Sequence, residues 1–366
     1  MSGFKIGKVA IGADHAPFII AEMSGNHNHS FERAIKIVEA AAHAGAQAIK
    51  LQTYTADTIT LNCNAPDFVI NDPNSLWAGR KLYELYDEAH TPWEWHAPIF
   101  KRARELGLEV FSSPFDETAV DFLENLNAPA YKIASFECTH LPLIRKAAST
   151  RKPIIISTGL ASEDEIFEAI AAARDGGAKD IMILKCTSDY PARPEDANLV
   201  TIDDMQKKFG VLVGLSDHTL GVDTAVQAVK YYGAVAIEKH ITIDPEEGGV
   251  DAAFSLGPKE LQALVEKTEF AWKTGRKSPQ DNADSPAHGK VHYGGTEKEQ
   301  NSKAFRQSVQ IRKPIKKSEK LTADNICIRR PGYGLAPKYY DQMLGKKAVR
   351  DLAMGERTNL KMISES

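Results

Sequence analysis

The feature of this sequence that most limits its fold is a repeated alternation of short apolar runs with amphipathic segments. The runs are nearly continuous in Ile, Val, Leu and Ala, as is typical of parallel strands that are covered on both faces. They comprise residues 18–23, 48–53, 109–114, 130–135, 153–158, 181–186, 211–216 and 234–240. Segments with helical spacing lie between them, including 31–44, 93–106, 163–174, 224–232 and 259–272. Ser162 followed by Glu165 predicts a capping box at the start of the third of these helices.

Eight strand–helix repeats match the architecture of a (β/α)₈ barrel. A doubly wound open sheet is the alternative, because periodicity does not show whether a sheet closes. No GxGxxG motif follows the first strand, which disfavours a nucleotide-binding open sheet. We therefore predict an α/β fold with a TIM barrel over residues 1–274.

The composition changes after Trp272. Residues 275–304 are rich in Lys, Gly, Pro, Ser and Asp and predict a linker or an exposed loop. Residues 305–366 resume with short apolar–polar runs and turn signals, which predict a small, mostly β domain. A domain of this size buries little apolar surface by itself, so we expect it to pack on another surface.

Charge and cysteine content indicate which partners and which compartment to expect for this protein. Lys and Arg number 45 against 49 Asp and Glu, so there is no basic excess for binding nucleic acid. No apolar run approaches the roughly 18 residues that span a bilayer, and the first residues lack the pattern of a signal peptide. The four cysteines (Cys63, Cys138, Cys186 and Cys327) form no CxxC pair. We expect a cytoplasmic protein with reduced thiols, a small-molecule ligand, and neither nucleic acid nor membrane as a partner.

Every predicted strand ends in polar or charged residues. In a closed barrel these ends meet at one mouth, where barrel enzymes have their active sites. The residues are Glu22, Lys50, Gln52, Ser112, Ser113, Lys132, Ser135, Glu137, Ser157, Thr158, Lys185, Thr187, Ser188, Ser216, Asp217, His218, Glu238, Lys239 and His240. A single serine more often satisfies local backbone, but several serines with two lysines suit a phosphate or a carboxylate. Lys50 and Lys132 are the stronger indication, because a buried lysine without an anion carries a large desolvation cost.

His218 and His240 end neighbouring predicted strands. Two imidazoles are too few for a structural zinc site, which normally has four protein ligands. An open site completed by water, carboxylate and substrate oxygen would suit a catalytic ion such as Mn²⁺ or Mg²⁺. A general acid–base pair, or two hydrogen-bonded core histidines, is the alternative.

Seven motifs in order along the chain resemble the sialic acid synthase family. They are IAEMSGNHN (20–28), IKLQTY (49–54), SSPFD (112–116), YKIASFE (131–137), STG (157–159), GLSDHT (214–219) and EKH (238–240). In the tail, RRPGYG (329–334) resembles the family's antifreeze-like (SAF) domain. Members of this family join phosphoenolpyruvate to an N-acyl amino sugar and release phosphate. The resemblance therefore implies a transferase that makes a nine-carbon 2-keto-3-deoxy sugar acid.

Three stretches are most similar to the branch of the family that makes pseudaminic acid: residues 76–96, 111–137 and 185–192. Ser188 stands where sialic acid synthases typically carry Asn, and Ser113 stands in place of the usual Thr. Both departures disfavour N-acetylmannosamine as the substrate. The resemblance implies a 2,4-diacetamido-2,4,6-trideoxy hexose of the altrose type, with synthesis of N-acetylneuraminic or legionaminic acid as the alternative.

The resemblance also implies roles for individual residues. The expected phosphoenolpyruvate ligands are Lys50, Ser113, Lys132, Ser135, Ser157, Ser188 and Ser216. His218 and His240 would bind a divalent ion, first Mn²⁺, with Mg²⁺ and Co²⁺ as alternatives. The expected sugar ligands are Gln52, Glu137, Tyr190 and Asp251. Family members are homodimers in which the tail reaches the partner's barrel, so Phe305 and Arg330 would complete the other subunit's site.

The catalytic base remains open between Glu22, which ends the first strand, and Glu137. A rival of a different mechanism is a Schiff-base aldolase that uses Lys132 or Lys185 and needs no metal. A non-catalytic sugar-binding barrel is the rival from another class.

Overall fold

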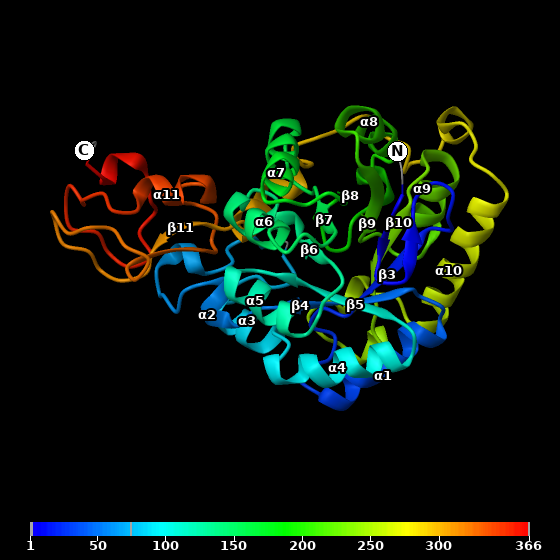
Figure 1. Cartoon of the computed structure of the whole chain (residues 1–366), viewed down its shortest axis with the longest axis horizontal. Helices are drawn as coiled ribbons and strands as arrows, with labels where there is room; N and C mark the ends of the chain where they lie inside the picture. Colours follow the sequence, from blue (N-terminus) through cyan, green and yellow to red (C-terminus); the bar gives the residue numbers. More distant parts are fainter. Residues whose placement is uncertain (1–2, 74, 365–366) are drawn as a thin grey trace.

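Eight parallel strands close into a barrel in this computed structural model, which describes residues 3–73 and 75–364 (Figure 1). The strands are β3 (Phe18–Glu22), β4 (Ala48–Thr53), β5 (Glu109–Pro114), β6 (Tyr131–Ile133), β7 (Ile154–Ser157), β8 (Ile181–Cys186), β9 (Leu212–Asp217) and β10 (Ala236–His240). Pairing of β10 with β3 closes the ring. The predicted TIM barrel is confirmed, and the open sheet is wrong.

The main helices surround the barrel in the order expected for this fold. They are α1 (Phe31–His43), α4 (Trp93–Glu105), α5 (Glu117–Asn125), α6 (Leu141–Ala148), α7 (Glu163–Asp175), α8 (Val200–Phe209), α9 (Asp223–Tyr232) and α10 (Pro258–Lys273), with α2 (Ala56–Ile59) and α3 (Leu82–Ala89) inserted after β4. The predicted capping box starts α7, since Ser162 Oγ accepts from Glu165 N and the Glu165 carboxylate accepts from Ser162 N. None of the described helices has the length and apolarity needed to cross a membrane.

Alternation of side chains along each strand decides which residues enter the barrel. Residues such as Ile19 and Ile183 belong to the large core between the strands and the helices. Their neighbours Ile20 and Leu184 belong to a separate cluster inside the barrel. Because the period is two, the inward positions continue to Glu22 on β3 and to Cys186 and Ser188 at the end of β8.

An N-terminal hairpin, which the sequence did not indicate, covers the barrel end opposite to the polar strand ends. Strands β1 (Phe4–Ile6) and β2 (Val9–Ile11) are antiparallel. Ile6 and Ile11 are fully buried and join the interior cluster with Phe18 at the start of β3. The two strands are three residues long, too short to show a clear periodicity.

Most of residues 275–304, predicted as a linker or an exposed loop, pack along the barrel, and we call residues 276–305 the strap. Ala287 is buried in the outer core. The Tyr293 hydroxyl donates to Asp204 of α8 at 2.6 Å, and His288 Nδ1 lies 2.7 Å from the Tyr232 hydroxyl of α9. The strap ends in a 3₁₀ helix, Lys298–Phe305. A few aromatic and apolar anchors within a polar sequence are enough to dock it.

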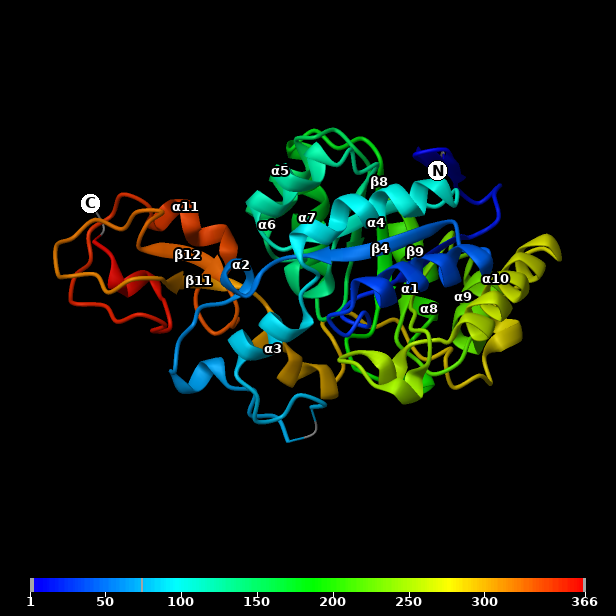
Figure 2. The same cartoon turned by 90° about the horizontal axis from the view of Figure 1, so that it is seen from below.

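The tail that follows has a small core of its own. Strands β11 (Ser308–Ile311) and β12 (Ile326–Arg329) are antiparallel, and the short helix α11 (Tyr340–Met343) packs near them. Both views show the tail beside α2 at one end of the molecule (Figures 1 and 2). Arg330 N donates to the Ile59 carbonyl of α2 at 2.8 Å, so the tail does lean on another surface, which here is its own barrel.

The hairpin should contribute to stability without contributing to ligand binding. Ile6→Ala removes buried methylene groups and should lower the free energy of unfolding by about 3 kcal/mol, measured by urea titration. Lys5→Ala, at an exposed position of the same strand, is the matched control and should change little. Equal losses in the two variants would show that the hairpin does not belong to the core.

Candidate active site

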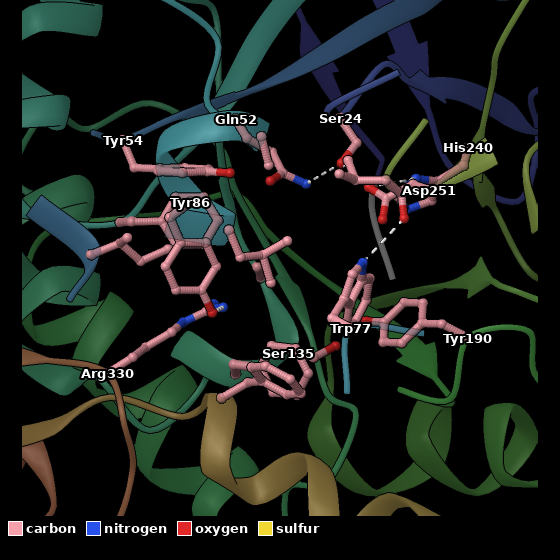
Figure 3. A pocket seen from close by; sticks show the side chains of 18 residues that line it. Ser24, Gln52, Tyr54, Trp77, Tyr86, Ser135, Tyr190, His240, Asp251 and Arg330 are labelled. Atoms are coloured by element: carbon pink, nitrogen blue, oxygen red, sulfur yellow. Dashed lines mark hydrogen bonds and ion pairs between the residues drawn. The ribbon is translucent and has the colours of Figure 1, made fainter. Parts of the chain in front are cut away.

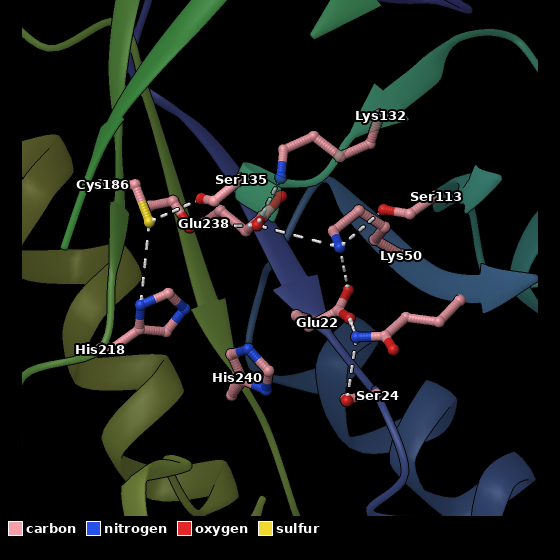
Figure 4. A network of polar contacts seen from close by, with 12 residues as sticks. Glu22, Ser24, Lys50, Ser113, Lys132, Ser135, Cys186, His218, Glu238 and His240 are labelled. Atoms are coloured by element: carbon pink, nitrogen blue, oxygen red, sulfur yellow. Dashed lines mark hydrogen bonds and ion pairs between the residues drawn. The ribbon is translucent and has the colours of Figure 1, made fainter. Parts of the chain in front are cut away.

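Two lysines and two glutamates form an ion-pair cluster at the centre of the mouth (Figure 4). Lys50 Nζ lies 2.6 Å from Glu22 Oε2 and 3.8 Å from Glu238 Oε1. Lys132 Nζ lies 3.0 Å from the same Glu238 oxygen. All four side chains are buried and occupy inward positions of their strands. The cluster is therefore the charged floor of the mouth.

Burial and mutual charge shift the pKa values of this cluster. Burial alone would lower the pKa of Lys50, but the carboxylates of Glu22 and Glu238 raise it. Desolvation lowers the pKa of Lys132, against the opposing charge of Glu238. Burial opposes ionisation of Glu238, yet the two lysines lower its pKa. For Glu22, burial prevails over Lys50 and raises the pKa, so this carboxylate is the one in the cluster most ready to take a proton.

Serine hydroxyls surround this floor. Ser113 Oγ accepts from Lys50 Nζ at 3.3 Å, and Ser216 Oγ donates to Glu238 at 3.2 Å. Ser135 Oγ and Ser188 Oγ converge on Gly159, where an added Cβ would overlap both oxygens. The backbone thus approaches these hydroxyls more closely than any residue with a side chain would permit.

Several buried polar atoms of the mouth have no hydrogen-bond partner among the described residues. They are Ser157 Oγ, Glu238 Oε2, His240 Nδ1, Glu137 Oε2 and Arg330 Nε. Unsatisfied buried groups are uncommon in folded proteins, and those found mark where a ligand or water is bound. The donors and acceptors therefore indicate a polar ligand that spans the mouth.

His218 and His240 lie beside the ion-pair cluster with ring centroids 5.3 Å apart. His218 Nδ1 hydrogen-bonds to the Thr187 carbonyl at 2.9 Å, which places the proton on Nδ1 and leaves Nε2 as a ligand. Burial lowers the pKa of His240 well below its usual value, and the charges of Lys50 and Lys132 act in the same direction, so its imidazole is neutral.

The two imidazoles fit an open metal site and not a closed one. Residues 3–73 and 75–364 contain no group of three or more His, Cys, Asp and Glu side chains arranged to hold a metal ion. The nearest carboxylate oxygen, Asp251 Oδ2, lies 3.9 Å from His240 Nδ1. His240 Nδ1 is itself buried and has no hydrogen-bond partner among the described residues. A divalent ion here would need water or substrate oxygens to complete its coordination.

A polar wall connects the histidines with the ion-pair cluster. Gln52 Nε2 donates to Glu22 Oε1 at 2.8 Å and to Ser24 Oγ at 3.0 Å. Ser24 Oγ donates in turn to Asp251, whose pKa is raised by burial. Gln52 and Asp251 thus lie where the sequence predicted ligands for a polar substrate.

The opposite wall is aromatic, and the cavity of about 140 Å³ between the two walls is the pocket of the mouth (Figure 3). Its rings belong to Tyr54, Trp77, Tyr86, Phe115, Phe136, Tyr190 and Phe305. Tyr190 packs on the histidine side, with its ring centroid 4.6 Å from that of His218. Phe305 packs against Trp77 and Phe136.

Arg330 of the tail is buried in this aromatic wall. Its guanidinium donates to Glu137 at 2.8 Å and to the Tyr86 hydroxyl at 2.9 Å. Its central carbon lies 5.2–5.4 Å from the ring centroids of Tyr86, Phe115 and Phe136. Burial raises the pKa of Glu137, with Arg330 opposing. Arg330 is therefore a buried residue of the mouth and not a solvated surface arginine.

The tail contributes two residues to the mouth in this single chain. Phe305 and Arg330 were expected in a partner's mouth, but in this single chain they line the mouth of their own barrel. Whether these residues enter their own or a partner's mouth in an assembly stays a prediction.

Some mouth residues had no role in the sequence interpretation. Glu238 was recognised as a strand end, but its ion pairs with both lysines were not foreseen. Ser24 and Cys186 share the inward alternation of Glu22 and Ser188, which would have identified them. Trp77 and Tyr86 lie in the insertion between β4 and α4, where no periodic signal indicates the mouth.

Outward positions exclude one of the predicted lysines from the mouth. The side chain of Lys185 points out of the barrel, where it donates to Thr187 Oγ1 at 3.0 Å and to the Cys186 carbonyl.

Lys239 also faces outward and is fully buried, with its Nζ 2.7 Å from Asp217 Oδ2. Asp217 also accepts from the Thr219 amide at 2.9 Å. The Asp217–Lys239 pair thus fixes the two strand ends that carry the histidines.

Comparison with known proteins gives the following similarities. The NeuB family model matches residues 37–278, and the SAF domain model matches residues 306–356. The chain is 43% identical to the pseudaminic acid synthase of Campylobacter jejuni, over 94% of this chain and 95% of that protein. It is 42% identical to the pseudaminic acid synthase of Helicobacter pylori, over 92% and 94%. The crystal structure of the spore coat polysaccharide biosynthesis protein SpsE from Bacillus subtilis matches with a TM-score of 0.85 and 32% identity, covering 100% of both chains.

The Asp217–Lys239 pair yields a stability prediction. Lys239→Met leaves the Asp217 carboxylate buried without its cation and should cost about 3–5 kcal/mol of unfolding free energy, measured by urea titration. Adding Asp217→Asn should recover part of the loss. Lys267→Met, which breaks an exposed pair with Asp223, is the control and should cost under about 1 kcal/mol. Similar losses for Lys239→Met and Lys267→Met would contradict this role.

Proposed function

The chain belongs to the NeuB family, and we propose that it acts as a pseudaminic acid synthase. The reaction would condense phosphoenolpyruvate with the open-chain form of a 2,4-diacetamido-2,4,6-trideoxy hexose. The products would be a nine-carbon 2-keto-3-deoxy sugar acid and phosphate. The observation that carries this proposal is a mouth that combines a lysine–serine anion seat with two open imidazoles, in a chain similar to pseudaminic acid synthases over nearly its full length.

We assign phosphoenolpyruvate to the seat formed by the two lysines and the serines around them. Lys50 and Lys132 would bind its phosphate and carboxylate by charge-assisted hydrogen bonds. Ser113, Ser135, Ser157, Ser188 and Ser216 would donate further hydrogen bonds, and Ser157 Oγ is already buried without a partner in the described residues. Because these donors are fixed before the substrate binds, they would stabilise charge with little reorganisation.

The sugar would occupy the cavity between the polar and the aromatic walls. Its aldehyde end would face His218 and His240, with Gln52, Tyr190 and Asp251 as hydrogen-bonding partners. Its far end would lie against Phe305, Arg330 and Glu137. An aromatic wall suits the methyl groups of a deoxy, N-acylated sugar better than it suits hydroxyl groups.

We propose a divalent ion on His218 and His240, with Mn²⁺ first and Mg²⁺ or Co²⁺ as alternatives. A bound ion would supply Lewis acidity to the aldehyde oxygen. The neutral imidazole of His240 and the carbonyl-oriented ring of His218 fit this role. Asp217 and Lys239 would hold both ligand-bearing strand ends in position.

Carbon–carbon bond formation would join C3 of phosphoenolpyruvate to the aldehyde carbon, and water would then add at C2 before phosphate leaves. Glu22 is our choice for the group that takes the proton of that water. It lies in the anion seat, and burial raises its pKa. Glu137 is held by Arg330 on the far wall, which suits it to bind the sugar.

An assay of phosphate release with the two substrates tests this function, and metal removal tests the site. The wild type should release phosphate only when both substrates are present, chelation should abolish the activity, and Mn²⁺ should restore it. His218→Ala and His240→Ala should each lower kcat by at least about 10³-fold with little change in Tm.

Two outcomes would refute these assignments. Full activity in a metal-free preparation would exclude the metal. Borohydride trapping of a pyruvate adduct on Lys132 would instead favour the aldolase mechanism.

We also propose that the enzyme is a cytoplasmic homodimer that exchanges its tails. Domain swapping preserves every contact while changing which chain provides it, so each mouth would receive Phe305 and Arg330 from the partner. The hinge would lie before Phe305, within the 3₁₀ helix Lys298–Phe305 that ends the strap. The four free cysteines support a reducing compartment.

Mixing two inactive variants tests the exchange. Arg330→Ala and His218→Ala place one defect in the tail and one in the barrel. If tails are exchanged, each mixed dimer contains one intact site, and partial activity should return after subunit exchange. If each tail serves its own barrel, both sites of the mixed dimer carry a defect, so the absence of activity in verified mixed dimers would refute the exchange.

A further inference from the structure

We propose that Glu299 of the strap is a positioning residue for the anion seat, acting through Ser188, an inference that rests on the proposed function. Glu299 does not enter the mouth. It lies behind the end of β8 and is 2% exposed, although both of its sequence neighbours are exposed. A carboxylate buried this deeply needs specific partners.

The carboxylate of Glu299 bridges the barrel and the strap. Its Oε1 accepts from the backbone N–H of Ser188 at 2.5 Å. Its Oε2 accepts from the backbone N–H of Thr296 at 2.7 Å, within the strap itself. One side chain therefore ties the backbone of a seat residue to a segment 111 positions further along the chain.

The hydrogen bond from Ser188 N–H to Glu299 matters because the Ser188 hydroxyl is already closely packed. Its hydroxyl faces Gly159 and the Ser135 hydroxyl, at a distance that excludes any Cβ on Gly159. Small displacements of the Ser188 backbone would move this hydroxyl relative to Lys50 and Lys132. Loss of the Glu299 contact should therefore weaken binding of the phosphate-bearing substrate.

A charge argument explains why a carboxylate occupies this position. Lys185 is buried on the same outer side of β8, and its hydrogen bonds go to Thr187 Oγ1 and the Cys186 carbonyl, both neutral. Burial lowers the pKa of Lys185, and the charge that most opposes this shift is that of Glu299. The carboxylate thus helps to offset a buried cation directly behind the seat.

The rest of the strap is fastened to the same region. Gly294 N donates to the Ala161 carbonyl at 2.8 Å, and Arg306 binds Glu165 and the Leu160 carbonyl at 2.9 Å. Phe305, which lies between Gly294 and Arg306 in the sequence, lines the cavity of the mouth. The strap therefore connects the phosphate end of the mouth, through Ser188, with the sugar end, through Phe305.

The test compares three variants for their KM values and for thermal protection by phosphoenolpyruvate alone. Glu299→Ala should raise the KM for phosphoenolpyruvate by about tenfold or more, with less than about a threefold change in the KM for the amino sugar. Glu299→Gln keeps an acceptor for Ser188 but cannot also serve Thr296, so its effect should be smaller. Glu297→Ala, exposed and two residues away, should behave as the wild type.

The selective rise in one KM separates positioning from general loss of structure. If Glu299→Ala does not fold, a selective rise in Glu299→Gln supports the proposal, and an unchanged phosphoenolpyruvate KM in that variant overturns it. If the wild type gains no thermal protection from phosphoenolpyruvate, the proposed function fails and this inference fails with it. If wild type and Glu299→Ala are protected equally, only the role of Glu299 is refuted.

Discussion

Two ammonium groups inside a closed barrel are the constraint on which the rest of this structure depends. Lys50 and Lys132 occupy inward positions of β4 and β6, where water is excluded and an isolated charge is costly. Glu22 on β3 and Glu238 on β10, two strands that pair with each other, compensate the charges of these lysines. The carboxylates thereby hold the lysines in place at the mouth and oppose the effect of burial on their charge, so that an anionic substrate would meet preorganised donors.

The strap and the tail close one side of the mouth. The tail has a small core, and its Arg330 is buried only because it enters the barrel's aromatic wall and pairs with Glu137. A guanidinium surrounded by three rings and one carboxylate keeps its charge in an apolar setting. The strap fixes where this arginine arrives, and its own Glu299 contacts the opposite end of the mouth.

The metal site that we propose would use only two protein ligands, His218 and His240. Two imidazoles alone do not form a closed site, and the described residues offer no third ligand of the usual kind. The site is instead defined by its surroundings, since Thr187 orients one ring and the buried Asp217–Lys239 pair braces both strand ends. The remaining coordination of the proposed ion would be left for water and substrate, as in open catalytic sites.

The sequence alone determined the barrel, because the eight apolar runs and the helices between them follow local periodicities that any window of the chain displays. It also determined most of the mouth, since polar residues at the carboxyl ends of parallel strands must meet wherever the sheet closes. Only the tertiary structure decided which strand residues face inward together, and so paired Glu238 with Lys50 and Lys132 and turned Lys185 away from the mouth. It also decided the course of residues 276–305, the burial of Arg330, and the contact of Glu299 with Ser188. These three features depend on contacts between segments that are distant in sequence. The energies of such contacts come from burial and charge pairing, which local sequence patterns do not reveal.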